Sequence, residues 1–106
     1  MPKFMYRVSY SAEGVKGVIK DGGSARRASI EPIVEGLGGS LESFYFALGD
    51  DDAYVVADLP SNAAAAALSL AVNASGAARV TTVPLMTPEE MDEAADATPS
   101  YTPPGG

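Results

Sequence analysis

The fold is decided by the segment LESFYFALGDDDAYVVADL, residues 41–59, which holds two strand-like runs around a short acidic break. Leu41–Leu48 and Asp52–Leu59 are both rich in aromatic and β-branched residues, which favour strands. Between them lies Gly49-Asp50-Asp51, and glycine and aspartate are typical of tight turns. The segment therefore predicts a β-hairpin.

The residues before this hairpin first alternate and then change to a helical period. Apolar residues at every second position predict a strand over residues 3–10. Ser11 and Ser24 are suitable N-caps for two helices, the second of which ends at Gly38-Gly39. The apolar positions that recur at helical spacing are Val15, Val18 and Ile19 in the first helix and Ile30, Ile33, Val34 and Leu37 in the second.

The residues after the hairpin predict a helix, a strand and a final helix. Pro60-Ser61-Asn62 ends the hairpin and caps an alanine-rich helix over residues 63–75, whose small-residue face allows close approach to a sheet. Residues 79–85 predict a strand, and Thr87-Pro88-Glu89-Glu90 opens a short helix. The order βαββαβ plus a C-terminal helix predicts an α+β, ferredoxin-like sandwich, with two helices on one face of a four-stranded antiparallel sheet.

We expect one domain over residues 1–95 and a flexible tail over residues 96–106. The tail is rich in proline, glycine and small polar residues, which do not sustain a helix or a strand ladder. The first residues lack the pattern of a secretory signal, and no apolar run approaches the roughly 18 residues that span a bilayer. We therefore expect a cytoplasmic protein.

The composition excludes several kinds of chemistry. The 106 residues include no cysteine and no histidine, which rules out thiolate nucleophiles, Ser-His triads and zinc sites built from either residue. Fourteen acidic against seven basic side chains give a net charge of -7, which disfavours binding to nucleic acid or to an anionic membrane. Asp50, Asp51 and Asp52 would suit Mg²⁺ or Ca²⁺, but neighbouring side chains on an extended chain diverge, so we interpret them as a solvated turn. We expect no metal and no cofactor.

A sheet with helices on one side leaves its other face uncovered. The predicted strands are apolar on both faces, because Phe4 and Met5, like Phe44 and Tyr45, are adjacent and point to opposite sides. A monomer rarely exposes a large apolar patch. We therefore expect a homo-oligomer that assembles through the open sheet face.

Several segments together resemble the GYD-domain proteins, over about residues 3–93. The resemblance rests on Phe4-Met5-Tyr6-Arg7-Val8, Leu37-Gly38-Gly39, Phe44-Tyr45-Phe46-Ala47-Leu48-Gly49, and the alanine-rich helix followed by Val80-Thr81-Thr82 and Thr87-Pro88-Glu89-Glu90. In the motif that names the family, Gly49 and Asp52 match and Asp51 stands where the family has tyrosine. The resemblance implies a ferredoxin-like fold of the dimeric α/β-barrel kind and self-association, and it implies little about activity.

Five residues are candidates for binding a ligand: Tyr6, Arg7, Tyr45, Asp52 and Tyr54. Tyrosines that line a cavity can hydrogen-bond a ligand while their rings pack, although Tyr6 has the parity of the apolar stripe and suits core packing. Arg7 lies in a central strand, where a charge is costly unless it pairs with a carboxylate or receives an anionic ligand. Its candidate partners are Glu42, Asp52 and Asp58. Asp52 alternatively caps the turn backbone.

Arg26 and Arg27 lie at the start of the second predicted helix, where cations oppose the helix dipole. They mark either an anion site beside Gly22-Gly23-Ser24 or a pair of surface cations. The glycine pair lacks the spacing of a nucleotide-binding loop, so we favour the surface pair.

These features support three hypotheses about function. The first is a small-molecule binding module, an oligomer with an apolar, tyrosine-lined cavity and polar groups from Arg7, Asp52 and Tyr54. The alternative is a cofactor-independent isomerase, lyase or oxygenase in which Asp52 acts as base, with its pKa raised by burial well above about 4. The third is a structural or regulatory subunit that acts through its sheet face or its tail.

Overall fold

The computed structural model describes all 106 residues and confirms the predicted order of elements. The two helices predicted before the hairpin are both present, and a single residue, Gly22, connects them. The elements are β1 (Lys3–Tyr10), α1 (Ala12–Asp21), α2 (Gly23–Gly36), β2 (Ser40–Phe46), β3 (Ala53–Asp58), α3 (Asn62–Ser75), β4 (Ala78–Leu85) and α4 (Pro88–Asp96).

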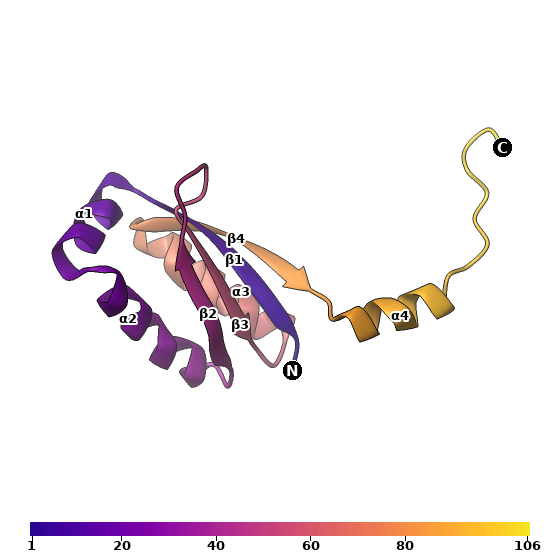
Figure 1. The fold of residues 1–106 in the computed structure, drawn as a ribbon, viewed down its shortest axis with the longest axis horizontal. Helices are drawn as coiled ribbons and strands as arrows, with labels where there is room; N and C mark the ends of the chain where they lie inside the picture. Colours follow the sequence, from indigo (N-terminus) through magenta and orange to yellow (C-terminus); the bar gives the residue numbers. More distant parts are fainter.

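The four strands form one open antiparallel sheet in the order β2-β3-β1-β4. β1 and β3 are therefore the central strands, as a ferredoxin-like topology requires. In Figure 1, α1 and α2 run along the β2 side of the sheet, α3 runs behind it, and α4 stands apart. The protein thus has the predicted α+β, ferredoxin-like fold.

The core lies between the sheet and the helices on one face only. Phe4, Tyr6 and Val8 of β1 point to this covered face and are buried there. The helical layer has two arms, α1–α2 and α3. Both arms contribute to the same core, because Ile30 comes from α2 and Leu68 from α3. All twelve buried residues are apolar or aromatic: Phe4, Tyr6, Val8, Ile30, Val34, Ala53, Val55, Ala57, Leu59, Ala65, Leu68 and Ala78.

The hairpin has a longer loop than its sequence predicts. β2 ends at Phe46 and β3 begins at Ala53, so residues 47–52 form the connection. The Ala47 N–H donates to the Asp52 carbonyl at 2.8 Å, and the Asp52 N–H donates to the Val8 carbonyl at 2.7 Å. These two bonds join Asp52, at the end of the loop, to the first loop residue and to β1.

Three of the predicted helix caps are confirmed and one is wrong. Ser11 and Ser61 accept hydrogen bonds from the backbone at the starts of α1 and α3, and Thr87 forms a capping box with Glu90 at α4. Ser24 does not cap α2, because that helix already begins at Gly23. Its N-cap is Gly22, whose φ of +85° suits a glycine.

The C-terminal part of the chain projects from the sheet and its helices, as Figure 1 shows. Every residue from 88 to 106 is exposed, and residues 97–106 form no helix or strand. The projection lengthens the molecule to 57 × 33 × 23 Å. None of the four helices combines the length and apolar character needed to cross a bilayer.

Candidate functional site

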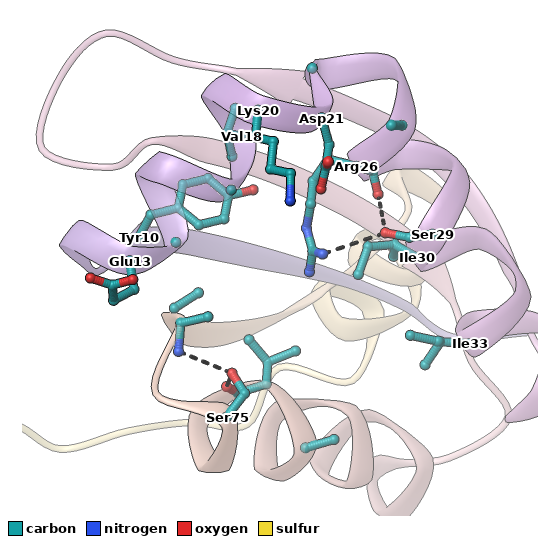
Figure 2. Close-up of a pocket in the computed structure, with 18 of the residues that line it drawn as sticks. Tyr10, Glu13, Val18, Lys20, Asp21, Arg26, Ser29, Ile30, Ile33 and Ser75 are labelled. Atoms are coloured by element: carbon teal, nitrogen blue, oxygen red, sulfur yellow. Dashed lines mark hydrogen bonds between the residues drawn. The ribbon is translucent and has the colours of Figure 1, made fainter.

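The helical layer is divided by a groove of about 750 Å³. One wall is formed by α1 and α2, and the other by α3 together with Ala77 and Ala78, where β4 begins (Figure 2). Both walls carry small residues, among them Gly17 on α1 and Ala71 and Ser75 on α3. The two arms of the helical layer therefore cover the sheet without filling the space between them.

One end of this groove is set by the close approach of α1 to the connection between α3 and β4. A Cβ atom on Gly14 would collide with the Ala77 carbonyl oxygen, so only glycine permits the approach. The Ser11 N–H donates to the same carbonyl at 2.9 Å, and the Ser11 hydroxyl donates to it at 3.1 Å. Gly14 is thus needed for packing, although it weakens the helix.

The floor of the groove is apolar. A small hollow of about 40 Å³ lies in it, and ten of its eleven lining residues are hydrophobic. They include Val8 and Val55 from the sheet and Ile30 and Val72 from the two helical walls. The single charged residue that reaches this hollow is Arg26.

Two cations of the groove have no carboxylate partner. Lys20 and Arg26 line it, whereas all four ion pairs of the protein use Lys3, Arg7 or Lys16. The Arg26 Nη1 donates only a long bond to the Ser29 hydroxyl, at 3.4 Å. Figure 2 shows the Lys20 ammonium, the Arg26 guanidinium and the Tyr10 hydroxyl directed into the same part of the groove. This part of the groove is therefore suited to an anion.

The charge of Arg26 also acts on Tyr10. Burial raises the pKa of the Tyr10 phenol, and the neighbouring Arg26 guanidinium opposes this rise. The phenol therefore keeps its proton at neutral pH and can donate a hydrogen bond into the groove.

The open face carries a different cluster, formed by Arg7, Asp51 and Tyr54. The Arg7 Nε donates to the Asp51 Oδ2 at 2.9 Å, and the Tyr54 hydroxyl donates to the same oxygen at 3.0 Å. The Arg7 hydrogen bond lowers the pKa of Asp51, and the Asp51 carboxylate raises the pKa of Tyr54. Tyr45 pairs with Tyr54 across β2 and β3 and is exposed.

Arg7 is therefore paired with Asp51, and not with Glu42, Asp52 or Asp58. Glu42 and Asp58 both bind Lys3, at 3.0 and 2.9 Å. Nowhere do three acidic side chains converge as a metal site requires. In the hairpin loop, the Asp51 carboxylate binds Arg7 and the Asp52 carboxylate binds the Tyr10 N–H, so the two carboxylates do not converge.

The other two candidates from the sequence lie away from this cluster. The Tyr6 hydroxyl donates to the Ala65 carbonyl at 2.8 Å inside the core, and burial raises the pKa of Tyr6 to about 12. The Asp52 Oδ2 accepts the Tyr10 N–H at 2.8 Å, which ties the hairpin loop to the end of β1. Of the five candidates, the structure brings together Arg7, Tyr45 and Tyr54.

None of the groove residues Tyr10, Lys20 and Arg26 is one of the five ligand-binding candidates. The sequence marks Arg26 only together with Arg27, as an anion site or a surface pair, and Arg27 is exposed and does not line the groove. The sequence signal that could have indicated the groove is the set of small residues on the predicted helices of both arms, because small side chains leave space above the sheet.

Comparison with known proteins places the chain in one family. No curated protein and no solved structure matches it. The family model of the GYD domain matches residues 4–95, which include all of the sheet except Lys3, together with α1, α2 and α3. The protein therefore belongs to the GYD-domain family.

Proposed function

We propose that the protein is a small-molecule binding module whose site is the groove between α1–α2 and α3. The observation that carries the proposal is the groove itself, about 750 Å³ over an apolar floor. Ligand sites are typically apolar clefts of roughly 300–1,000 Å³ with a few polar groups that orient the ligand. Tyr10, Lys20 and Arg26 supply such groups.

The uncharged dye Nile red tests this proposal, because its fluorescence rises and shifts to the blue in an apolar site. Ala71 lines the groove on α3, so Ala71→Trp fills it. Ala74 is also exposed on α3 but does not line the groove, so Ala74→Trp is the matched control. We expect saturable dye binding that Ala71→Trp weakens at least tenfold and Ala74→Trp leaves unchanged. Absence of saturable binding, or equal loss in both variants, contradicts the proposal.

We further propose that the protein forms a homodimer through its open sheet face. Met5 pairs with Val56 on one side and with Val83 on the other, and no helix covers this row. All three side chains are only half-buried in the single chain. Packing two such faces together would remove the row from water and leave both grooves open on the outside.

Sedimentation at micromolar concentration tests the dimer. The expected particle has twice the 10.8 kDa chain mass. Val56→Glu places a charge in the apolar row and should give monomers. Ile19→Glu changes an exposed apolar residue on α1 and should leave the dimer intact. A monomeric wild type, or a dimer that survives Val56→Glu, contradicts the interface.

The enzyme hypothesis remains an alternative without a specific observation in its favour. Asp52, its candidate base, accepts a backbone N–H from Tyr10 in the hairpin turn. That hydrogen bond gives the Asp52 carboxylate a structural role in holding the loop, and it does not direct the carboxylate toward a substrate.

A further inference from the structure

The groove combines one free guanidinium with apolar surroundings. Arg26 is half-buried, reaches the apolar hollow in the groove floor, and forms no ion pair. A cation in such a place loses water without gaining a counter-ion, which is costly unless a ligand supplies the negative charge. The planar fork of arginine suits a carboxylate, which it can bind with two hydrogen bonds.

Two further donors face the same part of the groove. The Lys20 ammonium and the Tyr10 hydroxyl are directed into it together with Arg26, as Figure 2 shows. Neither donor lies on the element that carries Arg26, since Tyr10 ends β1 and Lys20 belongs to α1. The fold therefore directs three donors from three elements into one part of the groove.

The acidic residues of the groove limit the charge that it can accept. Glu13 and Asp21 also line it, and Glu13 pairs with Lys16 at 3.3 Å. The chain as a whole carries a net charge of -7. A polyanion such as a nucleotide would be repelled by these charges. Lys20 and Arg26 against the unpaired Asp21 leave one positive charge, which matches a ligand with a single negative charge.

The length of the groove limits the apolar part of the ligand. Ile33 lines the groove seven residues beyond Arg26 on α2. At a rise of 1.5 Å per residue these positions are separated by about 10 Å along the helix. Ile30, Leu68 and Val72 also line the groove. A medium-length alkyl chain or an aryl group fits this span.

From these observations we propose that the ligand is a monocarboxylate with an apolar body. Arg26 binds the carboxylate, Lys20 and Tyr10 assist it, and the apolar body lies along the floor toward Ile33. This inference rests on the proposed function, because it names the class of ligand for the same groove.

Three probes with the same chain and different head groups test the ligand class. Decanoate, decanol and decylammonium are titrated into the full-length protein by calorimetry at neutral pH, below the concentrations at which they form micelles. We expect decanoate to bind at least about tenfold more tightly than decanol, because a charge-assisted pair is stronger than a neutral hydrogen bond. Decylammonium should bind most weakly. Equal affinities, or a preference for decylammonium, would overturn the assignment.

The matched variants are Arg26→Gln and Arg27→Gln, which remove the same charge from neighbouring positions. Arg26→Gln should remove most of the preference for decanoate, because the affinity for decanoate should fall far more than the affinity for decanol. Arg27→Gln should preserve the preference, because Arg27 does not line the groove. If both variants reduce decanoate binding equally, the effect is general electrostatics and the role of Arg26 is wrong.

The same titrations separate this inference from the proposed function. If decanoate and decanol bind the wild type equally and Ala71→Trp blocks both, the groove is a binding site and the ligand class is wrong. If no probe binds, and Nile red does not bind either, the groove itself is not a site and both proposals fail.

Discussion

The two faces of the sheet carry side chains of the same strands but differ in burial. On β1, Phe4, Tyr6 and Val8 point to the helices and are at most 7% exposed. Met5 lies between them in the sequence, points to the open face and is only half-buried. Parity along one strand thus separates the core from a surface that no part of the chain covers.

The two faces also differ in whether their cations have carboxylate partners. On the open face Arg7 is paired with Asp51, and Lys3 is paired with Glu42 and Asp58. In the groove of the covered face, Arg26 has no carboxylate partner. The cations of the open face are therefore compensated within the chain, whereas the groove is concave and has a cation that can pair with a ligand.

The largest expected effect comes from comparing Val55→Ala with Val56→Ala, the same change on opposite faces of β3. Val55 is 5% exposed and packs in the core, so its truncation should lower the free energy of unfolding by about 2 to 3 kcal/mol. Val56 is half-buried on the open face, and its truncation should cost less than about 1 kcal/mol in the monomer. Urea unfolding of both variants measures the difference.

The same unfolding experiment at several protein concentrations tests the dimer interface. If the open face is a dimer interface, the cost of Val56→Ala should grow with protein concentration, while that of Val55→Ala should not. Equal costs at every concentration would mean that the two faces are packed alike, which would break the comparison.

A smaller effect is expected from the pH dependence of Tyr6, on the covered face. Burial raises the pKa of Tyr6 to about 12, while its ordinary value is 10.0. Below pH 10 both states hold the proton, and the stabilising contribution is fully present. Between pH 10 and 12 the unfolded chain loses the proton first, so stability should fall by about 2 kcal/mol as the pH rises.

The variant Tyr6→Phe isolates this contribution. It removes the hydrogen bond to Ala65 at a cost of about 1 kcal/mol at neutral pH, and it should lack the additional loss at alkaline pH. Denaturant unfolding of the wild type and the variant from pH 8 to 12 measures the difference. Parallel curves would mean that the phenol is not held protonated by the core.

Two glycines of α1 give a third, smaller contrast at the wall of the groove. A Cβ atom on Gly14 would collide with Ala77, so Gly14→Ala should lower stability by roughly 1 kcal/mol or more. Gly17 has open space around its Cβ position, and Gly17→Ala should raise stability by about 0.5 to 1 kcal/mol through helix propensity. Thermal unfolding distinguishes these opposite signs. A stabilising Gly14→Ala would show that α1 is not held against Ala77.

The fold was predictable because its signals are local. The alternation of β1, the strand-rich hairpin and the caps at Ser11, Ser61 and Thr87 each report on a few neighbouring residues. The cap predicted at Ser24 is wrong for an equally local reason. Gly22, with its positive φ, occupies the N-cap position, so α2 begins at Gly23, before Ser24.

The groove was less predictable because it depends on how far apart two helical arms stand. Lys20 carries no sequence mark that separates it from other surface cations, and Arg26 is marked only by its place beside Arg27 at a predicted helix start. Their position becomes informative only when α1, α2 and α3 are placed on the sheet. The partner of Arg7 was missed for a similar reason, because the loop of residues 47–52 is longer than expected and carries Asp51 back toward β1.

The smallest expected effect tests whether the open face is internally compensated. Arg7 holds the pKa of Asp51 below its usual value of 3.8, so the pair contributes to stability above about pH 4 and this contribution is lost as the pH falls. Arg7→Gln should return the pKa of Asp51 toward its usual value, and salt should do so in part, because the Arg7 side chain is 45% exposed. NMR titration of the Asp51 carboxyl carbon measures both. Arg26→Gln is the control and should leave Asp51 unchanged, since Arg26 lies on the covered face. If Asp51 titrates normally in the wild type, Arg7 is free, and the open face becomes a second candidate for binding an anion.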